Sequence, residues 1–232
     1  AHRFDSADLT PLPLAEDEET LLEAALLADY RFQVYRQPKA KERPVKIRLK
    51  SQLPAAKLKV IRTTVESVNW ARDLVNHPSN WLTPKRLASQ FRELRRLSGV
   101  RVKIQGVQAL KRQGLELLLA VSRGSEEAPF LASAEYRPAR AKNKRPIVIV
   151  GKGVTFDSGG LNIKPTGYME DMKIDMAGSA VAFATLRAAA KLRLPYHLVA
   201  LAPLTENMIS GRSLKPGDII RSKAGLTVEI GN

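Results

Sequence analysis

Residues 146–151 read PIVIVG, a continuous apolar run that ends in glycine. Such a run is typical of a central strand that is buried on both faces of a sheet. Farther along the chain, a stretch of small and apolar residues long enough for a helix covers Ile174–Leu192, and a second short apolar run covers Tyr196–Leu201. A helix between two buried strands predicts an α/β fold, in which helices cover both faces of the sheet.

The chain upstream of this run also alternates between helical and extended patterns. An apolar stripe at helical spacing marks Lys57–His77. Thr83-Pro84 predicts the start of a helix that continues to about Leu97, because threonine caps the first turn and proline fits its first position. Four further elements are expected, in the order strand, short helix, strand and strand: Val100–Gln105, Val107–Gln113, Leu115–Val121 and Pro129–Tyr136.

The amino-terminal residues differ from the rest in composition. Ala15–Tyr30 has acidic residues early and leucines and alanines on one side, a pattern that predicts a helix. Residues 36–56 hold three prolines and a basic run, which indicates a linker around one short strand, Val45–Leu49. The composition therefore separates residues 1–56, which include the linker, from residues 57–232.

The composition of the 232-residue chain excludes several classes of protein. Hydrophobic residues make up 44% and charged residues 26%, the mixture of a folded globular protein and not of a disordered one. No apolar run approaches the ~18–20 residues that span a bilayer, and no secretory leader is visible, so we expect no membrane association. The absence of cysteine excludes thiol nucleophiles, disulfides and cysteine-bound zinc, and it favours a reducing, cytoplasmic compartment.

The net charge of +15 is unevenly distributed along the chain. Residues 1–30 carry eight acids and one arginine, so the remaining residues carry a net charge of +22. Seven of the 38 lysines and arginines lie in Arg36–Lys50 and five in Arg137–Arg145. This asymmetry indicates a surface for nucleic acid or an acidic partner, a solvated basic face, or one half of a larger protein whose other half is acidic. We favour a solvated basic face or one half of a larger protein over a surface for nucleic acid or an acidic partner. Arg36–Lys50 also lacks the interleaved aromatic residues on which single-stranded bases stack.

Three common nucleotide-binding and catalytic motifs are absent from this sequence. Gly151-Lys152-Gly153 lacks the serine or threonine of a phosphate-binding P-loop, and Phe156 replaces the third glycine of a dinucleotide-binding loop. The serine-hydrolase elbow G-x-S-x-G is absent. The three histidines, His2, His77 and His197, share no helical spacing, and His77, in a turn rich in proline and asparagine, is interpreted as structural.

Lysines and carboxylates gather in Val150–Asp175, between the predicted central strand and the next helix. Sheets of this class place their binding sites there, outside the carboxyl ends of the strands. Composition alone favours a solvated polar loop, but Lys152 directly extends the apolar strand and Asp175 begins an otherwise small and apolar helix. Carboxylates without histidine or cysteine suit magnesium, manganese or zinc. A lysine can join them only as the neutral amine.

The order of residues in this stretch resembles the leucyl aminopeptidase family, the dinuclear metallopeptidases also called cytosol aminopeptidases or family M17. The resemblance rests on several motifs, among them GKGVTFDSGG at 151–160, LNIKP at 161–165, MKIDM at 172–176, APLTENM at 202–208 and DLVN at 73–76. The spacing also matches: Lys152, Asp157, Lys164 and Asp175 follow one another at intervals of five, seven and eleven residues. The similarity extends from about Leu21 to Asn232.

The resemblance implies roles for these four residues. Lys152, Asp157 and Asp175 correspond to ligands of one of two divalent metal ions, zinc or manganese, and Asp157 also bridges to the second ion. Lys164 corresponds to the catalytic lysine that polarises the scissile carbonyl group and meets the growing oxyanion.

Further implied roles concern the substrate and the remaining ligands. Met172 corresponds to a wall of the pocket for the first side chain of the substrate. Asn232, assigned to substrate binding, begins the family signature NTDAEGR; its acidic residues supply the other metal ligands and its arginine holds a bicarbonate that acts as base. The rest of this signature lies beyond the chain end. The resemblance therefore implies that residues 1–56 are the end of an N-terminal domain with a linker. It also implies that residues 57–232 are an incomplete catalytic domain that lacks its C-terminal half, so residues 1–232 alone are expected to be inactive.

The resemblance also implies a fold and an activity. The fold is α/β, a three-layer sandwich with a mixed central sheet (the first half of an M17-type catalytic domain), preceded by a linker helix. The activity is the release of N-terminal, leucine-type residues from peptide substrates by a cytoplasmic homo-hexamer. The alternative is a catalytically dead aminopeptidase-like subunit whose basic surface binds nucleic acid or an acidic partner. The retained Lys152 and Lys164 argue against that alternative.

Overall fold

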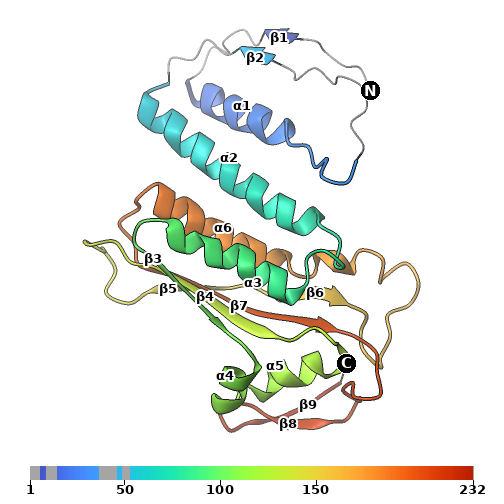
Figure 1. Ribbon diagram of the computed structural model, residues 1–232. Helices are drawn as coiled ribbons and strands as arrows, with labels where there is room; N and C mark the ends of the chain where they lie inside the picture. The colour runs from blue at the N-terminus through green and yellow to red at the C-terminus, as the bar shows by residue number, and fades with distance from the viewer. Residues whose placement is uncertain (1–5, 9–14, 37–45, 49–52, 232) are drawn as a thin grey trace. The chain divides into compact units, whose positions relative to one another are not determined.

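The computed structural model describes residues 6–8, 15–36, 46–48 and 53–231, which divide into two compact units with a boundary between Asn69 and Trp70 (Figure 1). The first unit contains β1 (Ser6–Asp8), α1 (Ala15–Ala28), β2 (Lys46–Arg48) and the first part of α2 (Ala55–Asn76). β1 and β2 pair in parallel, and Lys57 of α2 forms an ion pair with Glu19 of α1. The two helices and the short strand predicted for this part of the chain are confirmed.

The second unit is built, within residues 70–231, on a mixed sheet of five strands. β7 (Leu198–Asn207) pairs antiparallel with β4 (Phe130–Tyr136), which pairs antiparallel with β3 (Val100–Gln105). β5 (Ile147–Val150) and β6 (Gly153–Asp157) both run parallel to β7, one after the other along its length. These pairings confirm the expected α/β fold with a mixed central sheet.

Helices cover both faces of this sheet, so the unit has three layers (Figure 1). One face carries α3 (Pro84–Arg92) and α6 (Ala177–Lys191); the other carries α4 (Val107–Arg112), α5 (Glu116–Val121) and a hairpin of β8 (Ile219–Arg221) with β9 (Thr227–Glu229). The predicted start of α3 is confirmed, because the Thr83 hydroxyl accepts a hydrogen bond from the N–H of Arg86 at 3.5 Å. Among the described residues, no helix has the length and apolar character needed to cross a membrane.

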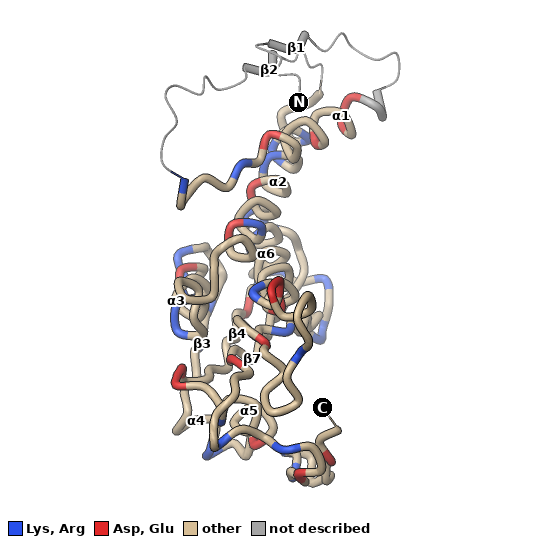
Figure 2. Tube along the Cα trace, turned by 90° about the vertical axis from the view of Figure 1, so that its right-hand side faces the viewer, with Lys and Arg blue, Asp and Glu red and all other residues tan. Residues whose placement is uncertain are grey.

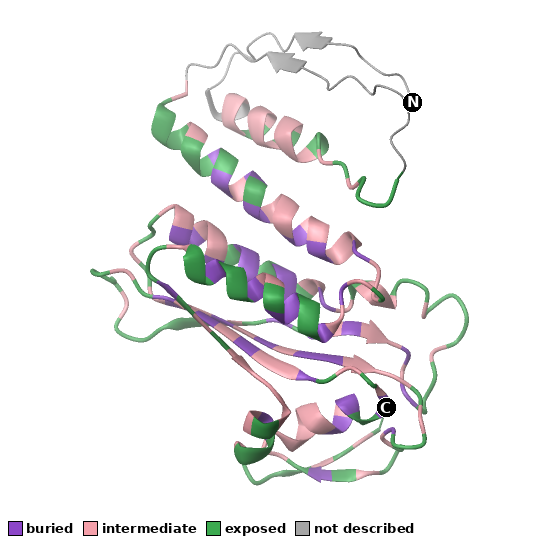
Figure 3. Cartoon of the chain, in the orientation of Figure 1, coloured by how far each residue is buried: buried purple, intermediate pink, exposed green. Residues whose placement is uncertain are grey.

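The main apolar core lies between the sheet and the layer of α3 and α6 (Figure 3). Phe91 of α3 and Phe183 of α6 are fully buried and stack with their ring centroids 3.7 Å apart. Alanines on the facing side of β4 and β7, such as Ala132 and Ala200, are also fully buried and leave room for these rings. Each buried aromatic side chain contributes on the order of 1.5–3 kcal/mol by leaving water. This packing holds α6, and the segment that leads into it, against the sheet.

The expectation that residues 146–150 form a buried central strand is wrong. β5 is a strand, but Ile147, Val148 and Val150 are 48%, 53% and 66% exposed. Among the described residues β5 pairs on one side only, with β7. An apolar run shows only that the side chains are hydrophobic. A strand is buried only when it has neighbouring strands on both sides and covering elements on both faces.

The expectation of a strand at Leu115–Val121 is also wrong, because Glu116–Val121 forms α5. A short apolar run does not distinguish a buried strand from one face of a helix. The leucines and alanine of this segment are strong helix formers, and the turn at Gly114 lets the chain reverse beforehand. Four short strands, β1, β6, β8 and β9, were not expected, since each is defined by its pairing partner more than by its own sequence.

Candidate metal centre

The four lysines and carboxylates singled out in the sequence lie around β6. Lys152 follows β5 and directly precedes β6, and Asp157 is the last residue of β6. Asp175 lies between a 3₁₀ turn, Met172–Ile174, and the start of α6. The segments therefore meet where β6 ends and the chain leads into α6.

A close approach of two backbones brings Lys152 to Asp175. A Cβ atom on Gly151 would overlap the carbonyl oxygen of Gly178, so only glycine fits at this position. The N–H of Ser179 donates a hydrogen bond to the carbonyl oxygen of Lys152 at 2.8 Å, which fixes the start of α6 beside the end of β5. As a result, the Nζ atom of Lys152 lies 2.5 Å from Oδ2 of Asp175.

The carboxylate of Asp157 is held by fixed donors on one oxygen and faces a lysine with the other. Its Oδ1 accepts hydrogen bonds from the N–H of Gly159 at 2.9 Å and from Nδ2 of Asn207 at 2.8 Å. Its Oδ2 lies 3.4 Å from Nζ of Lys164. Burial by itself raises the pKa of Asp157, but these two hydrogen bonds and the charges of Lys164 and Lys152 outweigh it, so the pKa is lowered.

Lys164 reaches Asp157 because the intervening loop folds back on itself. The N–H of Lys164 donates to the carbonyl oxygen of Ser158 at 3.0 Å, and Gly159 and Gly160 both take positive φ angles within this turn. The Lys164 side chain is 27% exposed, so its ammonium group is partly withdrawn from water beside Asp157. The structure therefore brings Lys152, Asp157, Lys164 and Asp175 into one cluster.

Asn207, a residue of β7 to which the sequence assigned no role in the site, contacts this cluster directly. It is the β7 partner of Asp157 in the sheet, and its carbonyl oxygen accepts hydrogen bonds from the N–H and the hydroxyl of Ser158 at 2.9 and 2.8 Å. A Cβ atom on Gly160 would lie 2.9 Å from Oδ1 of Asn207, so this side chain is enclosed. The position of Asn207 within the APLTENM motif was the available signal, but the contact depends on strand pairing between residues 50 apart.

The catalytic domain of the cytosol aminopeptidase family matches residues 69–232. The chain belongs to the cytosol aminopeptidase family.

Individual members of the cytosol aminopeptidase family are similar over nearly the whole chain. A probable cytosol aminopeptidase of Geobacter sp. (strain M21) is 41% identical, over 95% of this chain and 47% of the relative. The solved cytosol aminopeptidase of Coxiella burnetii is 34% identical with a TM-score of 0.83, over 94% of this chain and 45% of that one. The bottromycin maturation enzyme BotP, solved in complex with Mn, is 38% identical with a TM-score of 0.82, over 97% of this chain and 47% of that one. This chain therefore spans less than half the length of these relatives.

Met172 and Asn232 are the two residues that the family resemblance assigned to substrate binding. Met172 lies in the 3₁₀ turn just before Asp175, where it is partly buried. The N–H of Asp175 points to the carbonyl oxygen of Met172 at 3.4 Å, so the two residues belong to one turn. Asn232 lies outside the described residues.

The donor set of the cluster fits a metal-binding role in the cytosol aminopeptidase family. Oδ2 of Asp175 is buried and has no hydrogen bond, since the nearby Lys152 ammonium meets it only as an ion pair without hydrogen-bond geometry. Within the described part of the chain, no three histidine, cysteine or acidic side chains converge on a common point. A metal site here therefore depends on two carboxylates and the amine of Lys152. Oxygen-rich donors of this kind suit hard divalent ions.

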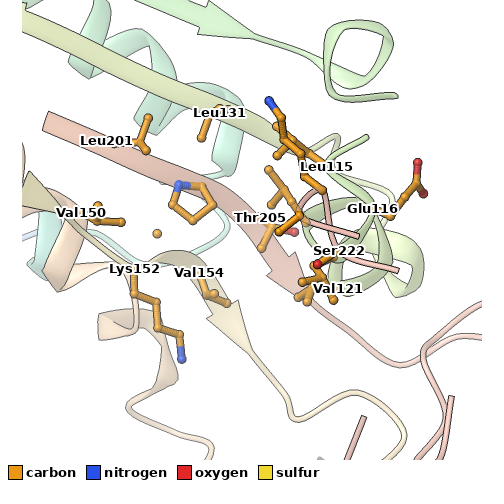
Figure 4. Close-up of a pocket in the computed structure, with 16 residues that line it drawn as sticks. Leu115, Glu116, Val121, Leu131, Val150, Lys152, Val154, Leu201, Thr205 and Ser222 are labelled. Atoms are coloured by element: carbon orange, nitrogen blue, oxygen red, sulfur yellow. The ribbon is translucent and has the colours of Figure 1, made fainter. Parts of the chain in front are cut away.

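An apolar cavity of about 570 Å³ adjoins the cluster on the α5 side of the sheet (Figure 4). Leu131 of β4, Leu201 of β7 and Val121 of α5 are among the residues that line it, and Lys152 lies at its edge. Figure 4 shows the amine of Lys152 extending away from this apolar lining. The cavity is therefore separate in chemistry from the charged cluster.

Proposed function

We propose that this chain is part of a metal-dependent aminopeptidase that releases N-terminal residues, leucine among them, from peptides. The observation that carries the proposal is the cluster at the end of β6, where Lys152 meets Asp175 at 2.5 Å and Lys164 meets Asp157 at 3.4 Å. The chain belongs to a family of aminopeptidases. The intervals between the four residues resemble those of the family's motifs. A catalytically dead subunit would have no chemical reason to retain both lysines beside both carboxylates.

In this proposal Lys152, Asp157 and Asp175 hold divalent metal ions. Manganese in the complex of the relative BotP supports divalent ions in general, and we propose zinc or manganese here. Such ions supply a water molecule acidified toward neutral pH and a positive site for the free amine of the peptide. Lys152 can bind a metal only as the neutral amine, so metal ions compete with protons for this group. Metal binding should therefore strengthen as the pH rises.

Lys164 has a different role in this proposal, because it acts as a fixed positive charge and not as a metal ligand. Its ammonium group is oriented by Oδ2 of Asp157 and partly withdrawn from water. A fixed positive charge in such a place stabilises the negative charge that develops on the carbonyl oxygen when the peptide bond is attacked. Asp157 in turn is oriented by Gly159 and Asn207, so the distance between Lys164 and the metal ligands is set by the end of β6.

The remaining assignments belong to the same proposal. Met172 forms one wall of the pocket for the first substrate side chain, and Asn232 contacts the substrate. A bicarbonate would supply the base, held by an arginine that is not among residues 1–232. Residues 1–56 are the end of an N-terminal domain with a linker, and residues 57–232 are the incomplete catalytic domain. The assembled protein is a cytoplasmic homo-hexamer.

A chimera tests the proposed activity. Residues 1–232 are joined to the second half of the Geobacter relative and assayed on a leucyl-anilide substrate with zinc or manganese. We expect turnover by the chimera and none by residues 1–232 alone, because Lys152, Asp157 and Asp175 are too few donors for two metal ions. The matched control is the chimera with Asp157→Ala and Asp175→Ala, which should be inactive. Robust turnover by residues 1–232 alone, or by the double variant, would contradict the assigned ligands.

A further inference from the structure

A lysine in the 3₁₀ turn beside the metal centre reaches the end of α2. Met172–Ile174 forms this turn, directly before Asp175. The ammonium group of Lys173 donates a hydrogen bond to the carbonyl oxygen of Asn76, the last residue of α2, at 3.3 Å. Both residues belong to the second compact unit, although they are 97 positions apart in the chain. The turn that leads to Asp175 is therefore tied to a helix end that is distant in sequence.

The end of α2 is a favourable place for a lysine. The last carbonyl groups of a helix have no partner within the helix, and the helix dipole makes this end negative. The last turn of α2, residues 73–76, contains an aspartate and no basic residue. Lysine and arginine are frequent elsewhere on the unit, for example on α3 (Figure 2), but Lys173 is half-buried and bonds to a backbone carbonyl. Lys173 thus supplies a positive charge that the last turn of α2 does not itself contain.

The chain that follows α2 is held firmly, so it can serve as an anchor. The ring of His77 stacks on the ring of Trp81 with their centroids 3.7 Å apart. The guanidinium group of Arg86 donates to the carbonyl oxygen of Trp81 at 3.2 Å and lies 5.1 Å from the centroid of its ring. Leu82, the residue after this tryptophan, is 1% exposed and belongs to the main core. The connection between α2 and α3 therefore has little freedom to move with the 3₁₀ turn.

Asp175 depends on such an anchor more than Asp157 does. The carboxylate of Asp157 is oriented by two hydrogen bonds, one from the backbone and one from a side chain. Oδ2 of Asp175 is buried and accepts no hydrogen bond from the described residues. The position of this carboxylate is consequently set by the backbone that carries it. On one side that backbone continues into Met176, which is fully buried, and on the other side it is held by Lys173.

We propose that Lys173 is a positioning residue for the metal ligand Asp175. Its bond to the end of α2 fixes the turn that carries Met172 and leads to Asp175, and so fixes the Asp175 carboxylate beside Lys152. This role rests on the proposed function, in which Lys152 and Asp175 bind metal ions. Lys173 acts through the backbone and is not itself a ligand. A lysine that only stabilised α2 would affect unfolding, whereas a positioning residue also affects the affinity for metal.

Manganese titration of the chimera, together with hydrogen exchange of its backbone amides in the metal-free state, tests this role. Lys173→Met keeps the length of the side chain and removes its charge, so manganese affinity should fall by about 10-fold. The amides of Ile174 and Asp175, which are bonded within the turn, should exchange about 10-fold faster, as expected when one hydrogen bond from a charged group is lost. Lys173→Arg retains a charged donor and should restore both values.

The matched control removes a lysine from the end of another helix. Lys111 lies in the last turn of α4, on the face of the sheet opposite α6, and Lys111→Met should change neither the manganese affinity nor the exchange of residues 172–175. Unchanged affinity in Lys173→Met, or an equal loss in Lys173→Arg, would overturn the positioning role. If the unaltered chimera bound no manganese, the proposed function would fail instead. Amide exchange would then decide the role of Lys173 by itself, and an unchanged rate in Lys173→Met would overturn it.

Discussion

β7 and β5 lie side by side in one sheet, and both are apolar runs in the sequence, yet their surroundings differ. Along β7 every second residue from Leu198 to Leu204 is buried, whereas three of the four residues of β5 are exposed. β7 has strand neighbours on both sides and α6 on one face, while β5 pairs only with β7 in the described part of the chain. Stability therefore resides on the β7 side, and the candidate chemistry lies at the open side, where β5 leads into β6.

The largest difference between the two strands should appear in the free energy of unfolding. Leu204→Ala of β7 removes a fully buried side chain and should cost about 2–5 kcal/mol, because it leaves a cavity. Val150→Ala of β5 should change stability by less than about 0.5 kcal/mol, since that side chain is 66% exposed. Urea unfolding followed by circular dichroism measures both; equal costs would mean that β5 is buried in solution.

A second prediction distinguishes a catalytic role of Lys164, beside the end of β6, from a role in packing. In the chimera, Lys164→Ala should lower turnover by about 10²–10³-fold, as the loss of an oxyanion donor does. Metal content and the unfolding midpoint should stay unchanged, because Lys164 is not a ligand and its side chain is partly exposed. Elemental analysis of the purified variant is the check. A variant that has lost its metal would show that Lys164 is itself a ligand.

A third prediction concerns the link between the two regions, the bond from Asn207 of β7 to Asp157 of β6. Asn207→Ala should weaken metal binding by about 10–100-fold, as the loss of a hydrogen bond to a ligand does. Asp157→Asn should have the greater effect and release at least one metal ion per subunit, because it removes the charge itself. Manganese titration of the chimera variants measures both. If Asn207→Ala binds metal normally, Gly159 alone is sufficient to orient Asp157.

The smallest predicted effect is a pH dependence of stability that arises from Glu206, near the carboxyl end of β7. Burial raises the pKa of Glu206, and the nearby negative charge of Glu127 adds to this effect. The hydroxyl of Ser125, which donates a hydrogen bond to Glu206 at 2.6 Å, lowers the pKa, but the net shift is upward. The folded chain therefore holds this proton more tightly than the unfolded chain does. Stability from this group should fall as the pH rises from its ordinary pKa of 4.5 through the raised value. Glu206→Gln should flatten the dependence in urea unfolding between pH 4.5 and 7; an unchanged profile would assign the dependence to another group.

Much of the site could be identified from the sequence because its residues lie within 24 positions of one another, from Lys152 to Asp175. The spacing of Lys152, Asp157, Lys164 and Asp175 is local information, and the structure brings the four side chains together. Asn207 could not be assigned in this way, since its contact with Asp157 exists only after β6 pairs with β7. The roles of all these residues remain predictions.

The sequence by itself determined those features that depend on neighbours along the chain. The apolar stripe of α2, the Thr83 cap of α3 and the small residues of α6 act over one or two turns of helix, so their spacing is sufficient. Tertiary structure alone decided which apolar run is buried, that Leu115–Val121 becomes helical, and that Lys173 reaches the end of α2. Burial and long-range hydrogen bonds depend on neighbours that are remote in sequence, and the sequence of one segment does not specify those neighbours.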